Sequence, residues 1–108
     1  MYSFPLKDDE VIIKKSHASF HVDGEAWSGA FYLTDRRVVF VGYMMDINKK
    51  FLGDIPLSQV SEVKGEKTFH IIPNVIHITA RNGYRCKVIV EGRNAWLTAI
   101  QEELAKQG

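Results

Sequence analysis

Apolar and polar residues alternate along most of this chain, and pairs of turn-forming residues interrupt the alternation at intervals. In residues 15–22, Phe20 and Val22 share one face with small residues, while His17 and His21 share the other. A period of two is typical of β-strands with one buried face. The pattern predicts strands at residues 15–22, 26–34, 37–41, 51–57, 60–67, 75–80 and 84–90.

Turn signals separate these segments. Asp23-Gly24 and Asn82-Gly83 each predict a hairpin, the second with a type I′ turn in which both central residues have positive φ. Asp35-Arg36 predicts a tight turn. Residues 42–50 break the alternation, so we expect a longer loop there.

The period changes near the end of the chain. From about residue 93 to residue 106 the apolar residues Trp96, Leu97, Ile100 and Leu104, with Ala99, recur at spacings of three and four. This spacing predicts one amphipathic helix. Strands followed by a single helix indicate an α+β, mainly β, domain, and its 108 residues suit one domain spanning 1–108. We expect the helix to close the open end of a bent sheet.

Two segments resemble the GRAM domain family. Residues 29–40 (Gly-Ala-Phe-Tyr-Leu-Thr-Asp-Arg-Arg-Val-Val-Phe) resemble its Gly, strand, Thr, turn and Arg signature, and residues 55–63 resemble its Ile-Pro-Leu segment. The Asn82-Gly83 hairpin and the Trp96 helix match its closing elements, so the likeness covers about residues 10–106. We expect a stand-alone domain, as in many bacterial members of that family.

The resemblance implies a pleckstrin-homology-like (PH-like) barrel. Its seven or so antiparallel strands form two near-orthogonal sheets, capped by one C-terminal helix, with Phe31 and Phe40 pointing inward. Members are typically non-catalytic. Some bind acidic phospholipids and others bind protein, so the likeness predicts the fold better than the ligand.

Charge and composition narrow the range of possible partners and locations. Lys and Arg total 14 and Asp and Glu total 13, a balance that argues against a nucleic-acid partner. The single cysteine, Cys86, excludes an intramolecular disulfide, and the N-terminus lacks the basic start and long apolar run of a signal peptide. We therefore expect a cytoplasmic protein, with peripheral contact at the inner membrane face as an alternative location.

Catalytic and metal-binding patterns are not found in the sequence. His17 and His21 lie about 13 Å apart on an extended strand, too far to share one ion, and we expect His70 and His77 to be surface residues. Cys86 falls mid-strand on the face of Val88, which favours a buried structural thiol over a nucleophile. We expect no enzyme activity, no cofactor and no metal.

Basic residues come in three doublets, Lys14-Lys15, Arg36-Arg37 and Lys49-Lys50. In a PH-like fold they could rim the barrel mouth and hold an anionic headgroup, each contributing about 1 kcal/mol. The simpler interpretation, which we favour, is that they are solvated residues at strand edges. The acidic residues 8–10 and Asp46 would weaken any positive field.

Two predicted loops are unusually apolar. One carries Tyr43, Met44, Met45 and Ile47, and the other carries Phe69, Ile71 and Ile72. Such loops can enter a membrane interface, contact a partner, or fold back on the core. Val39, Val41 and Ile89 add apolar side chains to the outward faces of strands, which suggests self-association. The sequence therefore predicts a non-catalytic module for protein interaction or self-association, with acidic phospholipid binding as the alternative.

Overall fold

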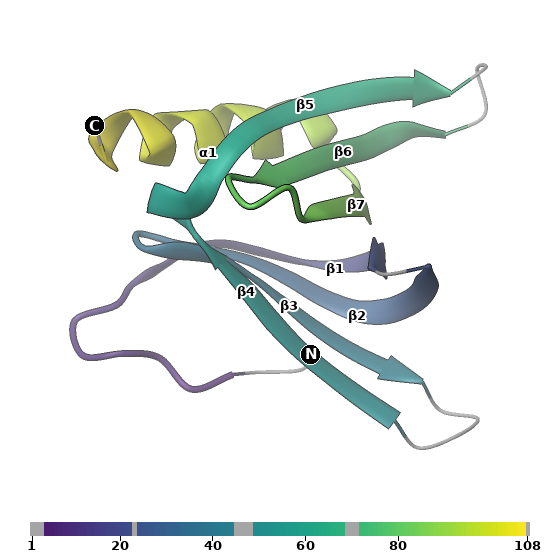
Figure 1. Cartoon of the computed structure of the whole chain (residues 1–108), viewed down its shortest axis with the longest axis horizontal. Coiled ribbons are helices and arrows are strands. Elements are labelled where there is room, and N and C mark those ends of the chain that lie inside the picture. The colour runs from purple at the N-terminus through teal and green to yellow at the C-terminus, as the bar shows by residue number, and fades with distance from the viewer. Residues whose placement is uncertain (1–3, 23, 45–48, 69–71, 108) are drawn as a thin grey trace.

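The computed structural model describes residues 4–22, 24–44, 49–68 and 72–107; at 43–44, 49–50, 66–68 and 72–73 it describes the backbone alone. A short 3₁₀ turn, η2, separates β4 from β5, and the helix comes last (Figure 1). The elements are β1 Ile12–Val22, β2 Glu25–Thr34, β3 Arg37–Met44, β4 Lys49–Pro56, η2 Leu57–Gln59, β5 Val60–Thr68, β6 Ile72–Ala80, β7 Arg85–Ile89 and α1 Arg93–Gln107.

The strands form one antiparallel hydrogen-bonded sheet in the order β4-β3-β2-β1-β7-β6-β5. The sheet bends between β1 and β7, which pair over only three residues, so that β1–β4 and β5–β7 become two facing layers (Figure 1). Helix α1 packs against β5, β6 and η2. This arrangement confirms the expected mainly-β PH-like barrel with one C-terminal helix.

The predicted bounds of the loop at residues 42–50 are wrong. Strand β3 continues to Met44 and β4 begins at Lys49, with Tyr43 opposite Lys50 and Gly42 opposite Phe51. Cross-strand pairing therefore extends the ladder through residues whose own alternation is weak. At the other end, β1 begins at Ile12 rather than residue 15, because an irregularity between Ile12 and Lys14 shifts the register there and interrupts the alternation.

The hairpin at Asn82-Gly83 forms, but not with a type I′ turn. Gly83 has φ +90°, whereas Asn82 is not among the described residues with positive φ. The Gly83 amide donates to the Ala80 carbonyl and the Ala80 amide donates to the Tyr84 carbonyl, so the connection is longer than two residues. The Asn82 side chain accepts the Tyr84 amide and thereby stabilises this longer turn.

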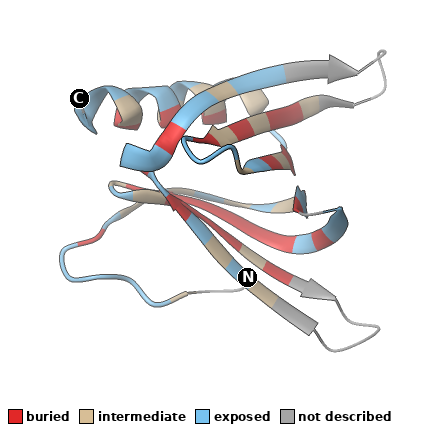
Figure 2. Ribbon diagram, viewed as in Figure 1, coloured by how far each residue is buried: buried red, intermediate tan, exposed pale blue. Residues whose placement is uncertain are grey.

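The core lies between the two layers, as the buried stripes in Figure 2 show. Phe31 and Phe40 point inward, as the family resemblance requires, and both are almost fully buried. The Phe31 ring lies 4.6 Å from that of Trp96 and 5.2 Å from that of Phe40. Helix α1 therefore closes the barrel through Trp96, with Ile100 buried one turn later.

A second apolar cluster lies on the outer face of the β1–β4 layer. It contains Ala30, Tyr32 and Val39, and Phe4 packs against them from the segment that precedes β1. The Phe4 ring meets the Tyr32 ring edge-on at 4.8 Å. Val39 was expected to face outward and to favour self-association, but here the chain's own N-terminal segment buries it.

Candidate functional site

An open groove of about 710 Å³ lies where β1 separates from β7. One wall comes from residues 16–19 of β1 with Ser28 and Gly29 of β2, and the other from Asn74 and residues 89–91 at the end of β7. This volume falls within the usual range of ligand pockets, about 300–1,000 Å³.

The groove results from the short pairing of β1 with β7. The register runs from His21 opposite Lys87 to Ser19 opposite Ile89 and stops there. Beyond Ile89 the chain turns toward β6, where the Val90 amide donates to the Asn74 carbonyl. β1 meanwhile continues along β2, so the two strands diverge and leave a wedge-shaped space.

The lining of the groove is mostly uncharged. Its described residues are three serines, Asn74 and His17 as polar groups, Ala18, Gly29, Ile89 and Val90 as apolar residues, and the acidic Glu91. Among the residues whose side chains the structure describes, neither lysine nor arginine lines it. This surface suits an uncharged polar or apolar chain better than a phosphate.

Lys49-Lys50, described only as backbone, lies in a different part of the sheet from the doublets Lys14-Lys15 and Arg36-Arg37. Lys14 pairs with Leu33, near the end of β2, whereas Lys50 pairs with Tyr43 in the row that crosses the sheet to Ser19. These rows place Lys14 and Lys50 roughly 20 Å apart along the sheet. The Lys14 ammonium lies 5.4 Å from the centroid of the Trp96 ring, while Lys15 and Arg36 are exposed.

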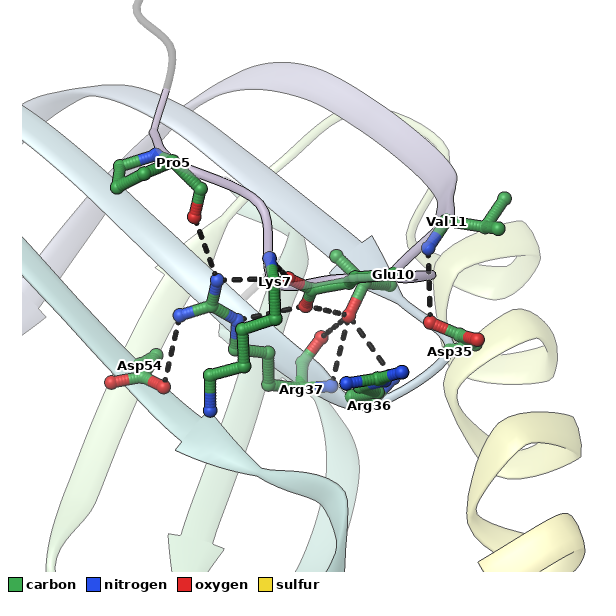
Figure 3. Close-up of polar contacts among 9 residues, drawn as sticks. Pro5, Lys7, Glu10, Val11, Asp35, Arg36, Arg37 and Asp54 are labelled. Carbon is green, nitrogen blue, oxygen red and sulfur yellow. Dashed lines mark hydrogen bonds and ion pairs between the residues drawn. The ribbon is translucent and has the colours of Figure 1, made fainter.

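Arg37 is held inside the molecule, and Figure 3 shows its contacts. Its Nε donates to Glu10 Oε2 at 2.8 Å and its Nη2 donates to Glu10 Oε1 at 2.9 Å. Nη2 also donates to the Pro5 carbonyl, and Nη1 reaches Asp54 Oδ2 at 3.3 Å. Only 12% of the Arg37 side chain is exposed, so this residue fastens the N-terminal segment rather than rimming an anion site.

The Glu10 carboxylate accepts several of the hydrogen bonds that hold the N-terminal segment in place. It accepts the Thr34 hydroxyl at 2.7 Å and the Lys7 amide at 2.9 Å. The Arg37 guanidinium lowers the Glu10 pKa from 4.5 to about 2, against the opposing effect of burial. Residues 8–10 were expected only to weaken a positive field. A signal for the observed role is the Pro-containing apolar segment at residues 4–6, which lies a few residues before Glu10 in the sequence.

Most side chains of the two apolar predicted loops lie outside the part of the chain that the structure describes. Met45, Ile47, Phe69 and Ile71 lie outside the described residues, and Tyr43, Met44, Lys49, Lys50 and Ile72 are described only as backbone at strand ends. Their proposed contact with a partner therefore stays a prediction. Among the described residues, the large exposed apolar side chains are Leu6, Val11, Ile13 and Leu52.

The candidate nucleophile and metal ligands have structural or solvent positions. Cys86 is buried, and burial raises the pKa of its thiol to about 12. His17 and His21 are exposed on β1, His77 is half-buried on β6, and His70 lies outside the described residues. Within the described ranges, no group of three His, Cys, Asp or Glu residues could hold a metal ion, and no helix is long and apolar enough to cross a bilayer.

Solved structures with this fold are numerous and distant in sequence. The C-terminal domain of an unknown protein from Leishmania infantum matches with TM-score 0.75 and 11% identity, over 91% of this chain and 87% of that one. The Vps36 N-terminal PH domain matches with TM-score 0.68 and 12% identity, over 94% and 84%. The linker-DH/PH structure of p115-RhoGEF matches with TM-score 0.70 and 9% identity, but this chain spans only 30% of it.

Sequence comparison supplies the family. Among curated proteins no sequence matches the chain. The GRAM domain family model, however, matches residues 1–93, which include all seven strands and the groove. The fold, the inward Phe31 and Phe40 and this match agree, and the chain belongs to the GRAM domain family.

Proposed function

We infer that this chain is a non-catalytic module that binds another protein through the groove between β1 and β7. The observation that carries this proposal is the lining of the groove, whose described residues offer hydroxyl, amide, imidazole and apolar groups with one carboxylate, and include neither lysine nor arginine. Members of this fold class commonly bind membranes or proteins, and a groove whose described lining has one carboxylate and no lysine or arginine favours the protein.

The positions of the basic residues support the same choice. A phosphorylated headgroup is held by several cations that point at one place. Here Arg37 is paired with Glu10 and Asp54, and Lys14 lies over Trp96. Lys15 and Arg36 remain exposed at one end of the sheet, and Lys50 belongs to a row nearer the other end.

The test uses linear 12-residue peptides selected from a phage-displayed library. Peptides that bind the wild-type chain should lose at least tenfold in affinity with Ser28→Tyr, because Ser28 lines the groove and is exposed. Ala26→Tyr is the matched control, since Ala26 is exposed on the same face of β2 but lies outside the groove. If no peptide is enriched, or if both variants bind equally well, the proposal fails.

Self-association is a form of the same proposal and has its own readout. Light scattering of the wild-type chain and of Ser28→Tyr at equal concentration compares their masses. A dimer that Ser28→Tyr dissociates would identify a second copy as the protein partner. A dimer that Ser28→Tyr leaves intact would place self-association elsewhere on the surface.

A second candidate function, peripheral membrane contact at the cytoplasmic face, has one specific observation in its favour. Val11 and Ile13 are 58% and 43% exposed, and they lie close to the exposed cations Lys15 and Arg36. Sedimentation with vesicles of phosphatidylserine and phosphatidylcholine tests it at low salt. Binding that disappears with Val11→Ser and Lys15→Glu together would favour the membrane over the groove.

A further inference from the structure

The backbone N–H and C=O groups of successive β1 residues point alternately toward β2 and toward β7. Val22 faces Glu25 across a two-residue connection, and in such a hairpin the two flanking residues bond to each other through their backbones. Hydrogen-bonded pairs then recur at every second residue. The even-numbered residues of β1 from Lys14 onward therefore bond to β2, and the odd-numbered ones turn their N–H and C=O toward the β7 side.

β7 meets only part of that odd-numbered edge. It pairs with His21 and Ser19, and its ladder ends at Ile89. The next two odd residues, His17 and Lys15, direct their backbone groups past the end of β7. The His17 carbonyl accepts the Ser16 hydroxyl at 3.0 Å, which uses one of its two lone pairs.

The groove runs along this open edge. Successive side chains of a strand point to opposite faces, yet the four consecutive residues 16–19 all line the groove. Ser28 and Gly29 of β2 also line the groove, so the space extends over the sheet beside β1 as well as along the edge that β7 leaves open. The N–H and C=O of His17 therefore face the groove.

We propose that this groove receives one extended segment of a partner polypeptide, which pairs as an added strand with the edge of β1 at His17 and continues beyond the groove toward Lys15. The proposal rests on the protein-binding function argued above and specifies how the partner is bound. Main-chain hydrogen bonds provide affinity in this mode of recognition, and pockets for alternate side chains provide specificity.

The position of this edge inside a groove determines whether a linear segment or a second folded copy can pair with it. The edge is recessed, because Asn74 and residues 89–91 form an opposite wall. A single extended chain fits between two walls, whereas two copies of this domain could not bring their recessed β1 edges together. The occupant is thus a linear segment and not the sheet edge of a second copy.

The residues that line the groove also indicate which side chains the bound segment should carry. Ser16 and Ala18 are small and leave room on the core side of the edge, so the segment should carry small or medium apolar residues at alternate positions. Glu91, at the end of the opposite wall, disfavours acidic residues nearby. The paired stretch spans about four residues, or roughly 13 Å.

The experiment uses the peptide that the phage selection enriches most. His17→Pro removes a backbone donor that faces the groove and leaves the ladder to β2 intact, a position at which strands tolerate proline. His17→Ala removes the side chain and keeps the donor. We expect His17→Pro to weaken binding about tenfold, His17→Ala to stay within twofold, and the His17 amide to exchange with solvent more slowly when peptide is bound.

N-methylation of the peptide backbone, one position at a time, keeps the test decisive if His17→Pro does not fold. An added strand loses affinity at alternate positions only, because every second N–H faces β1. If Ser28→Tyr abolishes binding but alternate N-methylation has no effect, the groove is used and the strand pairing is wrong. If no linear peptide binds at all, the proposed function fails with it.

Discussion

Replacing Glu10 with glutamine tests whether the N-terminal segment is held by charge. In the folded chain the Arg37 guanidinium lowers the pKa of Glu10 from 4.5 to about 2. At about 1.4 kcal/mol for each pKa unit, the ionised carboxylate contributes roughly 3 kcal/mol to folding. The carboxylate is fully buried and its partner nearly so, so solvent screens the pair little.

The sign of the pH dependence follows from the direction of the shift. A lowered folded-state pKa gives stability that is complete above pH 4.5 and is lost as the pH falls toward 2. Glu10→Gln should therefore lose roughly 3 kcal/mol at pH 7 and less than half of that at pH 3. For a domain of this size the loss at pH 7 corresponds to a fall in Tm of about 10–20 °C.

Urea unfolding followed by tryptophan fluorescence at pH 7 and pH 3 measures both differences. Asp9→Asn is the matched control, because Asp9 is the exposed neighbour of Glu10 and asparagine tolerates its positive φ of 62°. It should change stability by less than about 0.5 kcal/mol. If Glu10→Gln costs the same at both pH values, or costs no more than Asp9→Asn, the charge argument is refuted.

Three further substitutions or reactions probe the barrel. Gly29→Ala should prevent folding, because a Cβ there overlaps the Val41 carbonyl oxygen, whereas Ser28→Ala at the exposed neighbouring position should not; circular dichroism distinguishes them. Trp96→Ala should cost about 3–5 kcal/mol in urea unfolding, since this buried ring closes the barrel. Cys86, with its pKa raised to about 12, should resist iodoacetamide at pH 8 until urea unfolds the chain.

The local pattern of apolar and polar residues was sufficient to predict most of the strands and the helix. Strand alternation depends on which face is buried, and burial of Phe20 and Val22 opposite the exposed His21 shows this directly. The helical spacing of Trp96 and Ile100 likewise follows from a single buried face. Errors arose where a ladder with a neighbouring strand decided the outcome, as at Tyr43 and Lys50.

The N-terminal segment is held by polar contacts among Glu10, Arg37 and Asp54, which lie far apart in the chain. Glu10 and Arg37 are separated by 27 positions, and Asp54 by a further 17. A single sequence presents these three as an acidic run, a basic doublet and a lone acid. Only the antiparallel register of β3 and β4, which places Val39 opposite Asp54, brings Arg37 and Asp54 to the same end of the sheet.

The groove depends on an even less local property, the point at which β1 and β7 stop pairing. Residues 16–19 carry no sequence signal of an open edge, because they alternate as a paired strand does. The end of the ladder is determined by the turn of the chain after Ile89, where the Val90 amide bonds to Asn74 on β6. Val90 is buried there, so a side chain needed by the core also ends the β1–β7 ladder. Packing of the core thus leaves His17 with backbone groups that face open space, and a partner strand could satisfy them without disturbing the barrel.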